Sequence, residues 1–277
     1  MTAHKKIGIS VLLSLSLFLL ISSCSKSSST PATPPPTVVK HWDIVMNAKY
    51  ENPAPAGRTE TGTASLDLYS DNTFKYSIAV TGLAAGDALT ASHIHFADAG
   101  SNGPVILNFS PTFANGAATA TLPAIRQTLA DSIQNGTVYV NVHSTQVPGG
   151  LLRGQMDKTI DFAVDVPLVG TNEVPAVTTT ATGLALLRLT TDKTLYSKIT
   201  VANLELNDTL SVAHIHGAAA GANGSVLQGL CTSSADFGVV KINTLSDANV
   251  TAVKTGAVYV NAHTKLHPGG IIRGQIR

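Results

Sequence analysis

The 277-residue chain is poor in charged residues and in cysteine, and each shortage excludes a class of protein. Charged residues make up 13% of the chain, about half of the usual quarter, and 18 basic residues nearly balance 17 acidic ones. A near-neutral chain has no electrostatic footprint for nucleic acid, so we expect no nucleic-acid partner. Two cysteines are too few for a disulfide-stapled scaffold or a Cys-rich zinc module. A hydrophobic content of 44% argues against a disordered main body.

The N-terminus has the pattern of a signal peptide that ends at a lipid attachment site. Two lysines precede an apolar run over residues 7–21, which is shorter than the roughly 20 residues that a spanning helix needs. The run ends in Ile-Ser-Ser-Cys24, and a small residue directly before Cys resembles the lipobox of bacterial lipoproteins. This pattern predicts a signal peptide over residues 1–23, cleavage before Cys24 and acylation of Cys24. Ordinary secretion with a chance cysteine is the alternative.

A tether follows the predicted lipid anchor. Residues 24–39 are rich in Ser, Pro and Thr, a composition that forms no packed core and behaves as a disordered, extended spacer. Acyl chains contribute about 0.8 kcal/mol per buried CH₂, so several chains hold a protein on a bilayer. We therefore expect a lipid-anchored protein of the cell envelope. In some bacterial lipoproteins an aspartate directly after the acylated cysteine is linked to retention in the inner membrane. This chain has Ser25 at that position, which favours the outer membrane, on its periplasmic or its surface face.

The rest of the chain is a tandem sequence repeat of two copies, offset by about 120 residues. Three motifs recur: His-Ile-His at 93–95 and 214–216, Val-Tyr-Val-Asn-x-His at 138–143 and 258–263, and Pro-Gly-Gly-x-x-Arg-Gly-Gln at 148–155 and 268–275. This period is too long for a solenoid repeat, which spans roughly 20 to 50 residues. We therefore predict two tandem domains, residues 40–158 and 160–277, with little linker between them.

Each copy predicts antiparallel β structure with one short helix. Alternating residues at 66–69 and 74–80 flank a turn, which is typical of a hairpin. Gly and Pro interrupt the chain roughly every eight to twelve residues, as in a sandwich or barrel. The exception is a short helix predicted at 123–134, with a counterpart at 246–254. The expected fold class is all-β, with two tandem antiparallel sandwich-like or barrel-like domains.

The repeated polar residues share one face of the predicted strands. Side chains alternate along a strand, so the two histidines of His-Ile-His point the same way, and the Tyr, Asn and His of the second motif point away from its valines. The Pro-Gly-Gly turn brings back a strand that sets an Arg and a Gln beside them. The predicted polar cluster contains His93, His95, Tyr139, Asn141, His143, Arg153 and Gln155 in copy one, and His214, His216, Tyr259, Asn261, His263, Arg273 and Gln275 in copy two.

Three interpretations of this cluster are open. The favoured one is a hydrogen-bonded network that fixes strand register, because buried imidazole, amide and guanidinium groups need partners. The second is a Zn or Cu site, because a His-x-His pair with a distant third His suits both metals, although the nearby arginine opposes a dication. The third is catalysis with His as general base and Arg as anion clamp. The candidate metal ligands are His93, His95, His143, His214, His216 and His263.

Each copy also opens with Glu-x-Pro, at 51–53 and 173–175, and a glycine follows at Gly62 and Gly183. Together with the three motifs above, this pattern resembles the CHRD domain, a family named for chordin, an extracellular antagonist of bone morphogenetic proteins. The resemblance covers residues 40–156 and 161–277, and copy two fits the opening motif better. It implies an extracellular β-sandwich-like module that also occurs in secreted bacterial proteins, and the chordin link suggests protein binding.

These observations predict a cell-envelope lipoprotein with tandem CHRD-like domains, acting as a non-enzymatic binding or structural module. The expected partners are the membrane, through the lipid anchor, and an extracellular or periplasmic protein. The alternative is a metal-binding or redox module that uses the three histidines of each copy to hold Zn or Cu.

Overall fold

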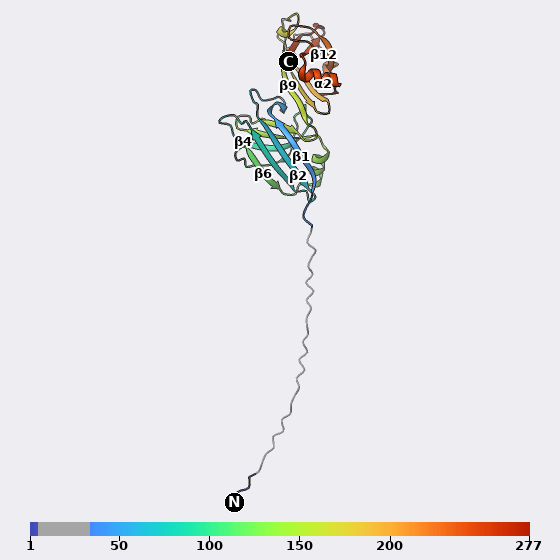
Figure 1. The fold of residues 1–277 in the computed structure, drawn as a ribbon. Coiled ribbons are helices and arrows are strands. Elements are labelled where there is room, and N and C mark those ends of the chain that lie inside the picture. The colour runs from blue at the N-terminus through green and yellow to red at the C-terminus, as the bar shows by residue number, and fades with distance from the viewer. Residues whose placement is uncertain (5–33) are drawn as a thin grey trace. The chain divides into compact units, whose positions relative to one another are not determined.

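The computed structural model describes residues 1–4 and 34–277 of the chain. Residues Pro36–Arg277 form one unit, which contains the strands and helices described below (Figure 1). The predicted cleavage site, Cys24 and most of the predicted tether lie outside the described residues. Within the described residues, no helix is long and apolar enough to cross a membrane.

The predicted all-β class with two tandem antiparallel domains is confirmed. The strands of the first domain are β1 (Val38–Asn47), β2 (Thr61–Tyr69), β3 (Phe74–Thr81), β4 (Leu89–Phe96), β5 (Val105–Asn108), β6 (Ala117–Leu122), β7 (Val138–Ser144) and β8 (Leu152–Gln155). Those of the second are β9 (Ile160–Val169), β10 (Thr182–Thr190), β11 (Thr194–Ala202), β12 (Leu210–Gly217), β13 (Ser225–Cys231), β14 (Lys241–Thr244), β15 (Val258–Thr264) and β16 (Ile272–Gln275).

Each domain is one eight-stranded sheet that curls into a barrel-like form around its core. The strand order is β5-β4-β7-β8-β1-β2-β3-β6 in the first sheet and β13-β12-β15-β16-β9-β10-β11-β14 in the second. The second order repeats the first with every strand number raised by eight, so the sequence duplication is also a duplication of topology. The first sheet is coloured from blue to green in Figure 1, and the second from yellow to red.

The core lies on the inner side of each curled sheet, because alternate residues of the strands point inward. In β3 the buried residues are Phe74, Tyr76, Ile78 and Val80, and each is followed by an exposed residue. Trp42 on β1 packs against Phe74 with 6.1 Å between the ring centroids. This strict alternation is the period-two pattern from which the hairpin was predicted.

A helix lies between β6 and β7, and its counterpart between β14 and β15. Helix α2 (Asp247–Thr255) begins after Ser246, whose hydroxyl accepts a hydrogen bond from the Asn249 N–H at 3.2 Å, close to the predicted start. Helix α1 (Gln127–Asn135) begins four residues later than the predicted start at Pro123. The reason is that β6 continues to Leu122, and the Ile125 N–H is bonded to the Asn72 carbonyl oxygen at 2.9 Å, which holds the intervening residues extended.

Strand β7 differs from β3 because both of its faces are covered. Val140 and Val142 face the core, while Tyr139 and Asn141 are buried on the other face. That outer face is covered by the β4–β5 loop, residues 97–104, and by the segment after the short 3₁₀ helix η1 (Ala48–Tyr50); the Asn52 amide joins the two by donating to the Ala99 carbonyl oxygen at 2.8 Å. The fold thereby places a buried polar layer over β4, β7 and β8.

Buried polar contacts join the two domains beside that layer. The Tyr50 hydroxyl donates to the Ile160 carbonyl oxygen at 2.9 Å. The fully buried Arg188 guanidinium donates to Asp165 Oδ1 at 2.7 Å and to the Glu51 carbonyl oxygen. The two copies therefore touch, as the short connection between them predicts.

Candidate functional site

The repeated polar residues lie on three adjacent strands in each copy. In copy one, His93 and His95 on β4 lie opposite Asn141 and Tyr139 on β7, and Arg153 on β8 lies opposite Asn141 from the other side. Copy two repeats this register with His214 opposite Asn261, His216 opposite Tyr259, and Arg273 opposite Asn261. The order of the strands in the sheet therefore brings together residues that are far apart in the sequence.

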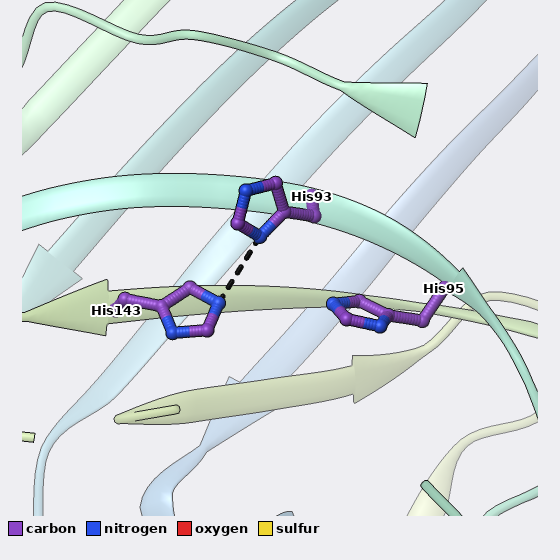
Figure 2. A group of neighbouring side chains, drawn as sticks. All are labelled: His93, His95 and His143. Atoms are coloured by element: carbon purple, nitrogen blue, oxygen red, sulfur yellow. Dashed lines mark hydrogen bonds between the residues drawn. The ribbon is translucent and has the colours of Figure 1, made fainter. Parts of the chain in front are cut away.

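The three imidazoles of each copy converge. Nδ1 of His93 lies 3.1 Å from Nε2 of His143, and the ring of His95 points toward the same place (Figure 2). Each of these three residues offers one nitrogen, and the three nitrogens lie within 4.8 Å of one another. In copy two, Nδ1 of His214 lies 3.3 Å from Nε2 of His263, and His216 completes a triad of the same dimensions.

Backbone carbonyl groups set the tautomers of these rings. Nδ1 of His95 is 2.9 Å from the Gly103 carbonyl oxygen, and Nδ1 of His143 is 2.8 Å from that of Pro148. A carbonyl oxygen can only accept a hydrogen bond, so each Nδ1 carries the proton and each Nε2 presents a lone pair to the centre of the triad. In copy two the Gly224 carbonyl oxygen does the same for His216, at 2.9 Å. His263 has an oxygen acceptor 3.0 Å from each ring nitrogen, the Pro268 carbonyl at Nδ1 and Asn261 Oδ1 at Nε2, so in the metal-free protein either nitrogen can carry its single proton.

The surroundings of four of these imidazoles favour the neutral form of the ring. Burial lowers the pKa of His93, His95 and His263, and burial together with two neighbouring imidazoles lowers the pKa of His214 to about 4. A neutral ring has one nitrogen lone pair that is free to bind a cation. Nε2 of His95 and Nε2 of His216 are both buried and have no hydrogen-bond partner in the protein.

Arg153 and Gln155 lie in the polar layer, and their side chains donate hydrogen bonds to the β4–β5 loop that covers it. The Arg153 guanidinium donates to the carbonyl oxygens of Asp98 and Ser101, the latter at 2.9 Å, and Gln155 donates to that of Ala97 at 2.8 Å. In copy two, Arg273 and Gln275 bond to carbonyl oxygens of the corresponding loop: Ala219, Ala222 and Ala218.

A tyrosine ring lies between the arginine and the histidines. Cζ of Arg153 is 3.5 Å from the centroid of the Tyr139 ring, and the His95 ring stacks on the same tyrosine at 4.8 Å with an interplanar angle of 6°. Since His95 lies on β4 and Arg153 on β8, on either side of β7, the phenol ring separates the guanidinium from the imidazole. Copy two has the same stack, with 3.3 Å for Arg273 and 4.9 Å for His216.

Glu51 and Glu173 belong to the site, although the sequence indicated them only as part of a motif. Glu51 Oε1 accepts a hydrogen bond from Asn141 Nδ2 at 3.3 Å. Burial raises the pKa of both carboxyl groups to about 7, against the opposing effect of Arg153 on Glu51 and of Arg273 on Glu173. The available signal was the recurrence of Glu-x-Pro in both copies, but nothing local in the sequence shows that its carboxyl reaches Asn141.

The layer adjoins a cavity in each copy. The cavity of copy one has a volume of about 370 Å³, and His95, Tyr139, Asn141, Glu51 and Gly103 contribute to its lining. That of copy two has a volume of about 240 Å³ and is lined in part by Glu173 and Arg273. A small ligand therefore has space next to the imidazole triad of copy one.

Comparison with known proteins gives two matches. A family model of the CHRD domain matches residues 43–156 and again residues 164–276. Chordin from Danio rerio is 25% identical in an alignment 236 residues long that covers 80% of this chain and 25% of chordin. The chain thus spans about a quarter of the length of this curated relative. No solved structure matches significantly.

Proposed function

The chain belongs to the CHRD domain family in both of its halves, and from this premise we propose that it is a non-enzymatic binding protein of the cell envelope with one binding site in each domain. The family membership agrees with the resemblance seen in the motifs. Since the chain covers only a quarter of chordin, the feature that the two proteins share is the domain itself. The geometry of the polar site therefore has to indicate the ligand.

The ligand that the site geometry supports best is a transition-metal ion, zinc or copper, held by the three imidazoles of each copy. The observation that carries this proposal is the convergence of three nitrogens within 4.8 Å in both copies. Zn–N bonds are about 2.0–2.1 Å long, so nitrogens on one tetrahedral ion lie about 3.3 Å apart. The separations of 3.1 and 3.3 Å between the paired nitrogens already have this value.

The outer contacts of the rings support the same ligand. Metal-binding histidines donate their other ring N–H to a carboxylate, a backbone carbonyl or water. His95 and His143 both donate to backbone carbonyl oxygens, as does His216 in copy two. This arrangement directs the lone pair of these three rings inward, and Nδ1 of His263 has the Pro268 carbonyl oxygen available in the same way.

The two other interpretations of the cluster receive less support. A network with a purely structural role would pair all of its buried polar atoms. Most of the imidazole nitrogens are paired, but Nε2 of His95 and of His216 have no partner in the protein. Catalysis with an anion clamp would need a free guanidinium, whereas Arg153 is fully buried and bonded to loop carbonyl oxygens. The sequence suggested that the positive charge of Arg153 would repel a divalent cation. In the structure the Tyr139 ring lies between this charge and His95.

Metal analysis of the purified chain tests this proposal. After incubation with zinc or copper salts and dialysis, we expect two ions per chain, one ion in His95→Ala or His216→Ala, and none in the double variant. His41→Ala is the matched control, because His41 is exposed and belongs to neither triad, and it should keep both ions. A wild-type chain that retains no metal, or a double variant that retains both ions, would refute the proposal.

A protein partner in the extracellular space or the periplasm is the second candidate, favoured by the likeness to chordin over 80% of this chain. Cross-linking on intact cells, followed by mass spectrometry, should then give one reproducible cross-linked protein with both the wild-type chain and the double histidine variant. Only self-cross-links in both samples would speak against this candidate.

We further propose that acylated Cys24 anchors the chain, with the outer membrane as its location. The apolar run and the Ile-Ser-Ser-Cys24 sequence support the anchor, and Ser25 supports the outer membrane. Protease treatment of intact cells would distinguish the surface face, where the domains are digested, from the periplasmic face, where they are protected.

A further inference from the structure

One polar side chain of the layer is directed at each imidazole triad from the centre of the sheet. Asn141 on β7 turns its Nδ2 toward Glu51 Oε1, at 3.3 Å, and its Oδ1 is buried without a partner in the protein. The corresponding oxygen of Asn261 lies 3.0 Å from Nε2 of His263. Because the amide nitrogen of Asn141 donates to Glu51, its amide oxygen lies on the histidine side.

The motifs on either side of the site hold this amide in place. A Cβ atom at Gly150 would lie 2.7 Å from Asn141 Nδ2 and 2.8 Å from Glu51 Oε1, so only glycine leaves room for the Glu–Asn pair. Gly270 has the same relationship, with 2.7 Å to Asn261 Nδ2 and 2.4 Å to Glu173 Oε1. The Glu-x-Pro and Pro-Gly-Gly motifs therefore meet at one side chain in each copy, which the three-histidine proposal alone leaves unexplained.

We infer that Oδ1 of Asn141 and Oδ1 of Asn261 are the fourth donors of the two metal sites, and that Glu51 and Glu173 are positioning residues for these amides. This inference rests on the proposed metal-binding function. Each site then offers three imidazole nitrogens and one amide oxygen, which matches the four-coordinate preference of zinc.

This donor set selects among metal ions. Imidazole suits Zn²⁺ and Cu²⁺, whereas Cu⁺ is selected by thiolate and thioether ligands. The residues that line the adjoining cavity of copy one include neither cysteine nor methionine. The site should therefore take a divalent ion, Zn²⁺ or Cu²⁺, in preference to Cu⁺.

Substitution of the two asparagines in the full chain tests the inference. Asn141→Leu with Asn261→Leu keeps the approximate side-chain shape and removes the oxygen, so we expect the Kd for Zn²⁺ and Cu²⁺ to rise by at least about 10- to 100-fold, the range found when only an outer-shell partner of a metal ligand is lost. Asn141→Asp with Asn261→Asp keeps an oxygen donor and should retain tight binding. Asn108→Leu is the control, because Asn108 is exposed on the neighbouring strand β5.

Two spectroscopic measurements separate ligation from folding. Circular dichroism of the metal-free variants reports whether the sheets form, and electron paramagnetic resonance of bound Cu²⁺ reports the donor set. We expect the copper hyperfine coupling to change in the Leu variants and to stay near the wild-type value in Asn108→Leu. Glu51→Gln with Glu173→Gln replaces one acceptor oxygen of each side chain with an NH2 donor and should weaken binding less than the loss of the amide oxygen.

The outcomes distinguish a failure of the asparagine donors from a failure of the three-histidine metal site. If the histidine variants lose metal while folded Leu variants keep the wild-type Kd and spectrum, asparagine is not a donor and the three-histidine site stands. If the wild-type chain binds neither ion, both fail. Tighter binding of Cu⁺ than of Cu²⁺, measured by competition with chelators of each oxidation state, would overturn the predicted selectivity.

Discussion

Nδ1 of His93 and Nε2 of His143 lie 3.1 Å apart, although 50 positions separate the two residues along the chain. His214 and His263, separated by 49 positions, repeat the contact at 3.3 Å. The contact exists because β4 pairs directly with β7, and β12 with β15. The pairing of the strands alone does not require histidine at these positions, and the repeated contact supports the metal sites proposed above.

Metal should stabilise the fold. A ligand that binds only the native state at 100 times its Kd contributes about 2.7 kcal/mol per site. We therefore expect the Tm of the wild-type chain to rise by several degrees when zinc is added, and the Tm of His95→Ala with His216→Ala to remain constant. Differential scanning calorimetry with and without a chelator measures both, and an equal shift in the two proteins would indicate binding elsewhere.

The two adjacent glycines of the Pro-Gly-Gly turn should respond differently to alanine. Gly150 has φ +132°, and a Cβ there would meet Asn141 and Glu51 below 3.0 Å, whereas a Cβ on Gly149 meets nothing within 4 Å. We expect Gly150→Ala to lower the free energy of unfolding by about 1–3 kcal/mol and Gly149→Ala to change it by less than about 0.5 kcal/mol. Urea denaturation compares the two, and equal losses would contradict the crowding seen at Gly150.

Acid should remove a stabilising contact at Asp87. Burial of this carboxyl raises its pKa, but hydrogen bonds from the Gln146 N–H, Ser144, Arg58 and Thr145 outweigh burial and hold the pKa well below its usual range. A depressed native pKa stabilises the fold at pH values above the unfolded pKa, near 4, and this stability is lost as the pH falls toward the native value. Asp87→Asn should therefore cost about 3 kcal/mol at pH 7 and progressively less below pH 4.

Asp208 provides the matched comparison for Asp87. It accepts hydrogen bonds from the N–H groups of Thr209 and Leu266, at 2.7 and 3.1 Å, but no salt bridge to Asp208 exists among the described residues. Asp208→Asn should therefore cost less than Asp87→Asn. Urea denaturation of both variants at several pH values checks the order, and a pH-independent loss for Asp87→Asn would contradict the carboxylate argument.

The predicted lipid anchor gives a simple cell experiment. Cys24→Ser should release the chain from the membrane fraction and abolish its labelling by an alkyne-tagged fatty acid. Cys231→Ser is the matched control, because Cys231 is buried and burial raises the pKa of its thiol to about 12. It should leave both localisation and labelling unchanged, whereas a Cys24→Ser chain that stays in the membrane would refute the anchor.

Much of the fold was predictable because its signals are local. The hairpin of β2 and β3 follows from strict alternation, and α2 was predicted at 246–254 as the counterpart of the first helix in the duplicated unit. The start of α1 was predicted too early because the bond from Ile125 to Asn72 comes from a distant part of the chain. The same limit applied to the site: the histidines were visible as motifs, whereas the role of Glu51 depends on a contact with Asn141, 90 positions away.

The sequence by itself determined the duplication, the β class and which side chains share a strand face, because repetition and the two-residue period of a strand are properties of neighbouring residues. Only the tertiary structure decided which nitrogen of each imidazole points inward, because the carbonyl groups of Gly103 and Pro148 set the tautomers. It also decided that the arginine lies behind a tyrosine ring and that the amide of Asn141 is held by Glu51. These relationships depend on strand order and on the loops that cover the sheet, and neither is encoded in the spacing of the motifs.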